Sequence, residues 1–363
     1  QIEGQELIDV ILAFKHAQHL RVGVREILGK DTPIDSHRSL SDIIEICLQE
    51  ITNEHYVQLV EKHGQPIMEN GSQKGKVAAP ILLGLGKLGG REPNFHSDVD
   101  IIFLYEGDGN TQPIRRGHKI RQTSNHHFFN ELAKRVLQTA TRTRPHGRLF
   151  DMDSKLRATH QHAPLAISID DYEAYLSEGD IPLWQYMGLC KARVLLASDA
   201  AKSRVRSLIT KTISQIKQKP KLKTAIYQAR INSEDGATER NLKRYQGGTM
   251  DIEFIVQMLQ LINGSSKDIQ HSGTLTALQK IQEHGLLSED DAYALSKSYV
   301  FLRRVESGLR LMDTTHRHDL PDQPLELEKL ASLLGYESPQ SLVTVCRRYR
   351  QDNRQRFEKI FNR

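Results

Sequence analysis

The sequence predicts an α+β protein that is mostly helical, with a small mixed sheet in the middle of the chain. Apolar residues recur at helical spacing toward both ends, whereas short apolar or alternating runs typical of strands occur only in the middle. Aromatic residues make up 6% of the chain, and the abundance of Leu, Gln, Glu, Lys and Arg also favours helix. Strands confined to one interval favour a small mixed sheet over a large doubly wound one.

Length and composition exclude several classes of protein. The 363 residues are enough for two or three domains. Lys and Arg number 50 against 45 Asp and Glu, so the formal net charge is +5. No apolar run approaches the ~18–20 residues that a membrane span needs. The composition therefore excludes a membrane-spanning, collagen-like or disordered chain, but it names no function.

The three cysteines, Cys47, Cys190 and Cys346, lie far apart and form no CxxC motif. This spacing argues against a disulfide framework and against a cysteine-based zinc site, and it predicts a reducing, cytoplasmic environment. The chain begins with Gln1 rather than Met and shows no signal-peptide pattern. We therefore expect a part of a longer protein or a processed product.

Three domains are expected. Residues 1–75 are expected to form an N-terminal helical segment that packs on the middle domain. Its helices break near Pro33, and Ser39 or Ser41 is the expected N-cap. Residues 76–200 are expected to form the middle domain, which mixes strands and helices, and residues 201–363 a C-terminal helical bundle domain.

The middle domain contains the expected strands. Residues 77–83 and 99–105 are short apolar runs, and residues 148–157 alternate between polar and apolar. A long helix is expected over residues 114–142. From about residue 170 the pattern is helical to the end of the chain.

A glycine-rich stretch follows the first strand. Gly84, Gly86, Gly89 and Gly90 lie within seven residues and enclose Lys87. Glycine lets the backbone approach a ligand closely and turn N–H groups toward an anion. The stretch therefore favours a phosphate as its ligand. An ordinary glycine-rich turn is the alternative, and the spacing is not that of a Walker loop.

Paired carboxylates sharpen this interpretation. Asp98 and Asp100 are two residues apart at the start of the second strand, so their side chains are expected on one face. A divalent cation would relieve their mutual repulsion. A solvated strand end is the alternative for a lone pair of this kind.

A third carboxylate strengthens the case for metal. Asp153 lies on the later alternating run, which also carries Lys155 and Arg157. Three carboxylates on adjacent strands can hold two metal ions for an in-line nucleotidyl displacement, and neighbouring cations can neutralise a triphosphate.

These residues carry a resemblance to a known family. Gly84-x-Gly86-Lys-Leu-Gly-Gly-Arg-Glu-x-Asn-x-x-Ser-Asp98-x-Asp100 resembles the signature of the glutamine synthetase adenylyltransferase family. That family belongs to the polymerase-β-like nucleotidyltransferase superfamily. The resemblance continues outside the signature, at residues 153–157, 184–194, 247–254 and 301–306. It covers most of the chain, from about residue 5 to the end.

The resemblance implies a bifunctional enzyme with two homologous halves that regulates nitrogen assimilation. One half transfers AMP from ATP to a tyrosine of glutamine synthetase and releases pyrophosphate. The other removes AMP by phosphorolysis. Gly247-Gly-Thr-Met-Asp251 is similar to the motif of the AMP-adding, C-terminal half, which we favour, and the AMP-removing half is the alternative.

The resemblance also implies site residues. Asp98, Asp100 and Asp153 are implied as ligands of two Mg²⁺ ions, with Asp153 nearest the attacking tyrosine oxygen. Contacts to the triphosphate of ATP are implied for the following residues: Gly89, Gly90, Ser97, Lys87, Lys155 and Arg157. The sequence departs from the family pattern at these positions: Lys155, Ala158, His160 and Ala163. Lys155 keeps the charge but loses the guanidinium fork, which affects triphosphate affinity.

Partners follow from the same resemblance. Glutamine synthetase is the expected protein substrate, a PII-type signal protein is the expected partner of the full-length enzyme, and neither membrane nor nucleic acid is expected. For Asp251 and Glu253 we expect an orienting contact toward the catalytic domain or a structural salt bridge. A non-catalytic nucleic-acid-binding module is the alternative of another class, but it leaves Asp98, Asp100 and Asp153 unexplained.

Overall fold

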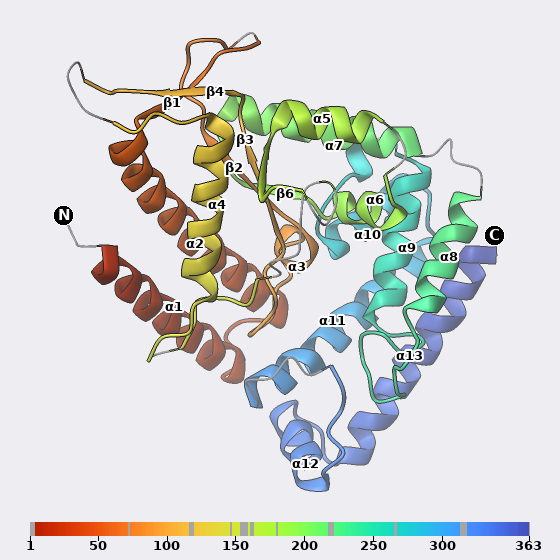
Figure 1. Ribbon diagram of the computed structural model, residues 1–363. Coiled ribbons are helices and arrows are strands. Elements are labelled where there is room, and N and C mark those ends of the chain that lie inside the picture. The colour runs from red at the N-terminus through yellow and green to blue at the C-terminus, as the bar shows by residue number, and fades with distance from the viewer. Residues whose placement is uncertain are drawn as a thin grey trace.

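The computed structural model of the chain describes residues 4–71, 73–115, 120–145, 147–152, 159, 163–178, 181–216, 221–264, 267–312 and 318–362. Helices at the start of the chain and helices of its second half lie on opposite sides of a small central sheet (Figure 1). The α+β, mostly helical fold class that the sequence predicts is confirmed.

The chain opens with two long helices, α1 (Gly4–Ile27) and α2 (Pro33–His63). Thr32 caps α2 in a reciprocal arrangement. Its hydroxyl accepts from the Asp35 N–H (3.3 Å), and the Asp35 carboxylate accepts from the Thr32 N–H (3.2 Å). The expected cap at Ser39 or Ser41 is wrong, because Pro33 already starts the helix and both serines lie inside it.

The central sheet has four strands in the order β5-β3-β2-β6. Strand β2 (Pro80–Gly84) is antiparallel to β3 (Ile101–Tyr105) and to β6 (Arg193–Leu196), whereas β5 (Ala166–Ser168) runs parallel to β3. Both expected strands of the glycine and carboxylate motifs are therefore present as neighbours. Strand β6 lies in a stretch expected to be helical. Its four residues are too few for periodicity to separate strand from helix.

Shorter elements surround the sheet. Strand β1 (Gln65–Met68) pairs with β4 (Gly109–Gln112) in a two-stranded sheet, and α3 (Gly86–Gly89) follows β2. Helix α4 (Asn125–Thr141) begins later than expected, because the Ser124 hydroxyl accepts from the His127 N–H and starts the helix there.

Side chains of the sheet alternate between two cores. Leu82 and Phe103 face the N-terminal helices and α4, whereas Ile81 and Ile102 face the helices of the second half of the chain. The helices of that half are α5 (Ile169–Ser177), α6 (Leu183–Cys190), α7 (Asp199–Ile216), α8 (Leu222–Asn232), α9 (Thr249–Ile262), α10 (Thr274–Glu283), α11 (Glu289–Met312), α12 (Pro324–Leu333) and α13 (Pro339–Asn362), with a short 3₁₀ turn, η1 (Lys267–Ile269).

A third core joins α11, α12 and α13 at the lower end of the molecule in Figure 1. Cys47, Cys190 and Cys346 are buried thiols, one in each of the three cores. Within the described ranges, no helix combines the length and the apolar character that crossing a membrane requires. The domain limits at residues 75 and 200 stay predictions, and the second of them falls in the first turn of α7.

Candidate active site

The carboxylate motif lies at the edge of the sheet where β3 begins. The Val99 N–H donates to the Asp151 carbonyl (2.8 Å), and Val99 pairs in parallel with Met152. This bridge makes the stretch extended, so Asp98 and Asp100 point away from the buried Val99 side chain. The described part of the run that precedes the third expected carboxylate, Asp151 and Met152, therefore lies beside this segment. Asp153 itself falls outside the described residues.

Gly86 packs directly against Asp100. The Leu85 N–H donates to the Asp100 carbonyl (2.9 Å), and Gly86 has a φ of +53°. A Cβ at this position would lie 2.5 Å from Asp100 Oδ2. Glycine is therefore required here by both backbone conformation and space, and its absent side chain leaves the Asp100 carboxylate room on that side.

The other motif glycines face protein rather than open space. A Cβ on Gly89 would lie 1.8 Å from the Lys191 carbonyl oxygen, and one on Gly90 would lie 3.0 Å from that of Ser272. The Ser97 hydroxyl accepts from the Asn94 N–H (2.9 Å), which closes the turn before Asp98. The expected contacts of these three residues with a triphosphate stay predictions.

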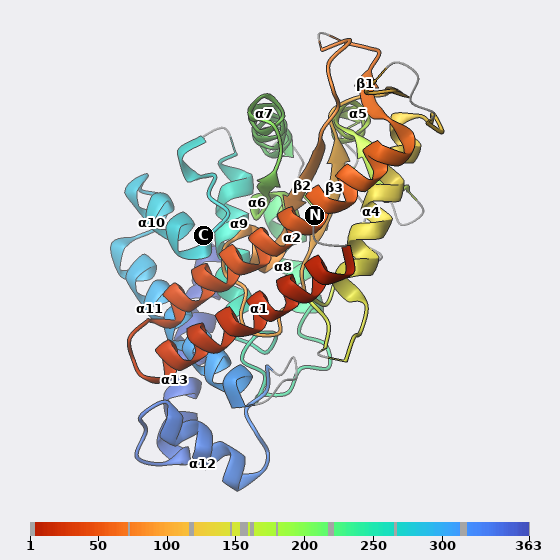
Figure 2. The same cartoon turned by 90° about the vertical axis from the view of Figure 1, so that its left-hand side faces the viewer.

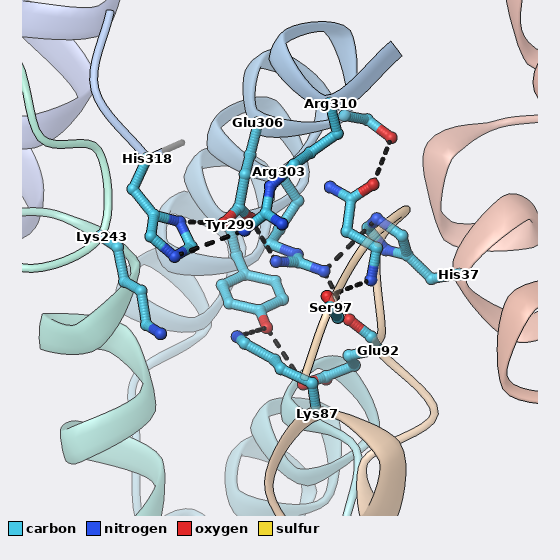
Figure 3. A network of polar contacts seen from close by, with 12 residues as sticks. His37, Lys87, Glu92, Ser97, Lys243, Tyr299, Arg303, Glu306, Arg310 and His318 are labelled. Carbon is cyan, nitrogen blue, oxygen red and sulfur yellow. Dashed lines mark hydrogen bonds and ion pairs between the residues drawn. The ribbon is translucent and has the colours of Figure 1, made fainter. Parts of the chain in front are cut away.

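Lys87 is enclosed between the two halves of the molecule. Its ammonium forms an ion pair with Glu253 of α9. The ammonium also donates to the Tyr299 hydroxyl of α11 (3.4 Å), as Figure 3 shows. Burial lowers the pKa of Lys87 to about 8, although Glu253 opposes the shift. The side chain expected to reach a triphosphate thus has two partners in the C-terminal helices.

Glu92 forms the second link to those helices. Its carboxylate accepts from the Lys191 ammonium (2.8 Å), the Thr274 N–H at the start of α10 (2.5 Å) and the Tyr299 hydroxyl (3.0 Å). Burial alone would raise the pKa of the Glu92 carboxyl, but Lys191 and Lys87 outweigh it and lower the pKa. Glu92 therefore stays charged inside a core, and three elements supply its partners.

Two arginines of α11 hold the turn that precedes Asp98. Arg303 donates to the Glu92 carbonyl, and Arg310 donates to the carbonyls of Phe95 (3.3 Å) and His96 (3.1 Å). Figure 3 shows both guanidinium groups in one buried network with Glu306. Burial lowers the pKa of Arg310, whereas Glu306 and Asp98 counteract this shift.

Asp251 and Glu253 have different partners, as their spacing on a helix requires. Glu253 makes the orienting contact toward the catalytic domain, through Lys87 and Lys191 (3.7 Å). Asp251 makes a structural salt bridge with the fully buried Arg230 (2.5 Å) and accepts from the Gly247 N–H (2.9 Å). The expected orienting contact is thus made by Glu253, and the expected structural salt bridge by Asp251.

Metal ligation is only partly described. Among the described residues, no three His, Cys, Asp or Glu side chains gather closely enough to hold a metal ion. The expected site residues Asp153, Lys155 and Arg157 lie outside them, as do the departures Ala158 and His160; Ala163 is buried. Asp98 is exposed and Asp100 half-buried, and both supply the carboxylate oxygens that Mg²⁺ prefers.

We call the segment between β2 and β3 the signature turn. Sequence reasoning missed the residues that hold this turn in place. Glu92, Tyr299, Arg303 and Arg310 were not singled out for a role. The available signal was the charge within the apolar face of α11, where Arg303, Glu306 and Arg310 occur among core residues at helical spacing. Buried charges at such positions require partners from another element.

Comparison with known proteins gives two adjoining matches. The family model described as glutamate-ammonia ligase adenylyltransferase matches residues 2–207. The model described as GlnD PII-uridylyltransferase matches residues 218–362.

Curated relatives extend over most of the chain. A protein of Ralstonia nicotianae is 28% identical over 93% of this chain and 37% of its own length. One of Nitrosococcus oceani is 29% identical over 98% of the chain and 36% of its own length, and one of Bordetella pertussis is 32% identical over 84% and 33%. All three are named bifunctional glutamine synthetase adenylyltransferase/adenylyl-removing enzyme. The chain spans about a third of the length of these relatives.

Proposed function

The chain belongs to the glutamate-ammonia ligase adenylyltransferase family, and we propose that it transfers AMP from ATP to a tyrosine of glutamine synthetase. The single observation that carries this proposal is the carboxylate edge. Asp98 and Asp100 flank a buried Val99 that pairs with Met152, the residue before Asp153. Carboxylates from two neighbouring segments at one sheet edge suit nucleotidyl transfer.

The carboxylates fit Mg²⁺ by two criteria. Asp98 and Asp100 offer hard oxygen donors on one side of an extended segment, and Gly86 leaves space at Asp100 that any larger residue would fill. We propose Asp98, Asp100 and Asp153 as the ligands. When bound, Mg²⁺ would polarise phosphate oxygens and neutralise charge that develops on them.

The reaction exchanges one phosphorus–oxygen bond for another. The tyrosine oxygen bonds to the α-phosphorus of ATP, the bond from that phosphorus to pyrophosphate breaks, and the phenol proton passes to solvent. The described residues around the site contribute by holding the turn before Asp98 in position. Arg303 and Arg310 hold the carbonyls before Asp98, and Glu92 fixes the turn to α10.

Triphosphate contacts are proposed for Gly89, Gly90, Ser97, Lys155 and Arg157. For Lys87, its ion pair with Glu253 supports a different part. We propose that Lys87 positions the glycine-rich turn, and that any contact with triphosphate requires it to exchange partners. Loss of the guanidinium fork at Lys155 lowers the expected affinity for ATP.

The remaining assignments concern the whole enzyme. We propose that the chain corresponds to the AMP-adding half, because its Gly247-to-Glu253 motif is similar to that half. We also propose glutamine synthetase as protein substrate, a PII-type signal protein as partner of the full-length enzyme, and a cytoplasmic location. Three buried thiols, one in each core, support a reducing compartment.

The test is a transfer assay with purified glutamine synthetase, Mg²⁺ and ATP labelled at the α-phosphate. We expect label on a glutamine synthetase tyrosine, and none when Asp100→Asn replaces the wild type. Release of ADP from AMP-modified glutamine synthetase on adding phosphate would reassign the chain to the AMP-removing half. Transfer that persists unchanged in the variant would reject the carboxylate site.

A further inference from the structure

Lys243 is a cation at the edge of the polar network around Tyr299. Its side chain is half-buried, and Figure 3 shows it extending toward Lys87 and Tyr299 with no dashed line at its ammonium. Within the part of the chain that the structure describes, no carboxylate forms an ion pair with it. Lys87 and Lys191, by contrast, both pair with Glu253. Among these three lysines, only Lys243 therefore keeps its charge for a ligand.

The main chain at Lys243 is held in a fixed position. The Leu242 N–H donates to the His318 carbonyl (2.8 Å), and the Met250 N–H donates to the Lys243 carbonyl (3.2 Å). A Cβ on Gly248 would lie 2.5 Å from that same carbonyl oxygen. Glycine thus permits the loop to return closely on itself at the start of α9. The loop presents Lys243 from a defined place in the fold.

The Lys243 ammonium acts on two members of the network. Burial would raise the pKa of Glu253, but nearby lysines, Lys243 among them, lower it. Burial lowers the pKa of His318, and Lys243 adds to this shift. The direction of the Lys243 side chain in Figure 3, below His318 and toward Lys87, agrees with both effects. Lys243 therefore lies between Glu253 and His318.

Both of these neighbours connect to the proposed metal site. Glu253 pairs with Lys87, which follows the glycine that packs against the second carboxylate of the sheet edge. The Nε2 atom of His318 lies 3.4 Å from Nη2 of Arg310, which donates to the carbonyls before the first carboxylate. Lys243 is thus linked on two sides to residues that position the carboxylate edge.

The network contains more cations than carboxylates. Its described members are five cations and three carboxylates: Lys87, Lys191, Lys243, Arg303 and Arg310 against Glu92, Glu253 and Glu306. While no metal is bound, Asp98 and Asp100 balance this excess. A Mg²⁺ ion at the sheet edge would neutralise them, and the excess of positive charge would then require an anion. Mg²⁺ held by carboxylates usually brings such an anion with it, as the phosphates of the substrate.

We propose that Lys243 binds the triphosphate of the nucleotide, through its β- or γ-phosphate. Lys243 then takes the part that the sequence favoured for Lys87, whose ammonium is engaged by Glu253. An ammonium on a long stem is a compact point charge that suits a phosphate group. The inference rests on the proposed function, because the proposed metal ligands are what place a triphosphate at this edge.

Isothermal titration calorimetry tests the contact by comparing ATP with AMP, each in the presence of Mg²⁺. Glutamine synthetase is left out, so that binding is measured without transfer. Lys243→Met should weaken ATP binding ~30-fold, because a charge-assisted hydrogen bond is lost. AMP binding should stay unchanged, because AMP has neither a β- nor a γ-phosphate. Lys243→Arg should retain most of the ATP affinity, since it keeps the charge.

The matched control is Arg244→Met, which removes a positive charge from the next residue of the same loop. The Arg244 guanidinium donates to the carbonyls of Ser233 (3.0 Å) and Asp235 (2.5 Å) instead of extending toward Lys87. ATP affinity should stay unchanged in this variant. Urea unfolding of Lys243→Met should show an unchanged midpoint, because no described ion pair is lost. A loss of ATP affinity in Lys243→Met then reports a missing contact and not a damaged fold.

Four outcomes would overturn the proposal. Equal ATP affinity of wild type and Lys243→Met would reject it alone and leave the proposed function standing. Equal losses for ATP and AMP would place the effect of Lys243 away from the β- and γ-phosphates. An equal loss in Arg244→Met would show an effect of net charge only. A wild type that binds no ATP would reject the proposed function and this inference together.

Discussion

The signature turn between β2 and β3 has two sides that differ in almost every physical respect. On one side, Asp98 and Asp100 lie at a sheet edge with partial exposure to solvent. On the other, Lys87 and Glu92 are enclosed by Lys191 and by helices α9, α10 and α11. The same short motif thus carries carboxylates at a sheet edge, which suit a metal ion, and buried charges that pair with the C-terminal helices.

Within one motif, the buried charges therefore serve stability, whereas the carboxylates at the sheet edge are proposed to serve the reaction. Charges in a dry interior stabilise a fold only when every partner is in place, and removing one partner leaves an uncompensated charge. Asp98 is exposed and Asp100 half-buried, so we expect the loss of either carboxylate to cost less stability than the loss of a fully buried partner. Substitutions on the buried side should therefore change unfolding, and substitutions on the open side should change activity.

The largest effect is expected at the open side. Asp100→Asn removes a proposed metal ligand, so it should lower AMP transfer by at least ~10³-fold. This corresponds to more than about 4 kcal/mol of transition-state stabilisation. The thermal midpoint should stay unchanged or rise, because one of two neighbouring like charges is removed. Label transfer and calorimetry measure the two quantities, with Asp322→Asn, at a highly exposed residue, as the control. A lower midpoint with intact transfer would contradict the comparison.

The buried side should respond in the opposite way. Lys191→Met removes the cation that Glu92 and Glu253 share and should lower the free energy of unfolding by about 3 kcal/mol. Urea unfolding measures this loss. The control is Lys280→Met, because Lys280 forms its ion pair with Glu283 at the surface, where such pairs contribute little to stability. If both variants lose the same free energy of unfolding, the buried Lys191 contributes no more to stability than the exposed Lys280.

Sequence reasoning captured the open side better than the buried one. Asp98 and Asp100 could be identified from the alternation of residues on a strand, which is a local property of the sequence. The pairing of Val99 with Met152, the residue before Asp153, also agrees with the expected neighbouring strands. The partners of Lys87 come from α9 and α11, more than 160 residues away. No local pattern fixes which distant charge meets which, so Lys87 was expected at a phosphate.

The fold shows the same limit. The two central strands and the long first helices were predicted because their periodicity is sustained. Strand β6 was not, because its identity depends on pairing with β2 rather than on its own four residues. The start of α2 was also misplaced, since Pro33 and the Thr32 cap outweigh serines further along. Non-local pairing and competing caps account for these errors.

The titration of Lys87 offers a smaller but distinctive test of the buried side. Burial lowers its pKa from 10.5 to about 8, so between pH 8 and 10 the unfolded chain binds more protons at this group than the folded chain. The free energy of unfolding should then rise with pH over this window, by about 2 kcal/mol from Lys87. Lys87→Met should lack this rise when urea unfolding is compared at pH 8 and pH 10. Parallel pH profiles for wild type and variant would contradict the burial of a charged Lys87.

The smallest expected effect concerns the junction between the two sides. Arg310 donates to the carbonyls of Phe95 and His96, so it links a buried helix to the turn that orients Asp98. Arg310→Lys keeps the charge but loses the fork that reaches both carbonyls. We expect ~10-fold weaker binding of Mn²⁺, a probe for Mg²⁺, as is typical when a group that orients a ligand is removed.

Mn²⁺ titration followed by electron paramagnetic resonance measures this affinity without relying on activity. Arg304→Lys is the matched control, because Arg304 is the next residue of α11 and donates to the Leu334 carbonyl instead of to the signature turn. If both variants bind Mn²⁺ equally, the turn keeps its shape without Arg310, and the two sides of the motif are mechanically independent. If only Arg310→Lys weakens binding, the buried network sets the geometry of the open edge, which would explain why one motif combines both kinds of charge.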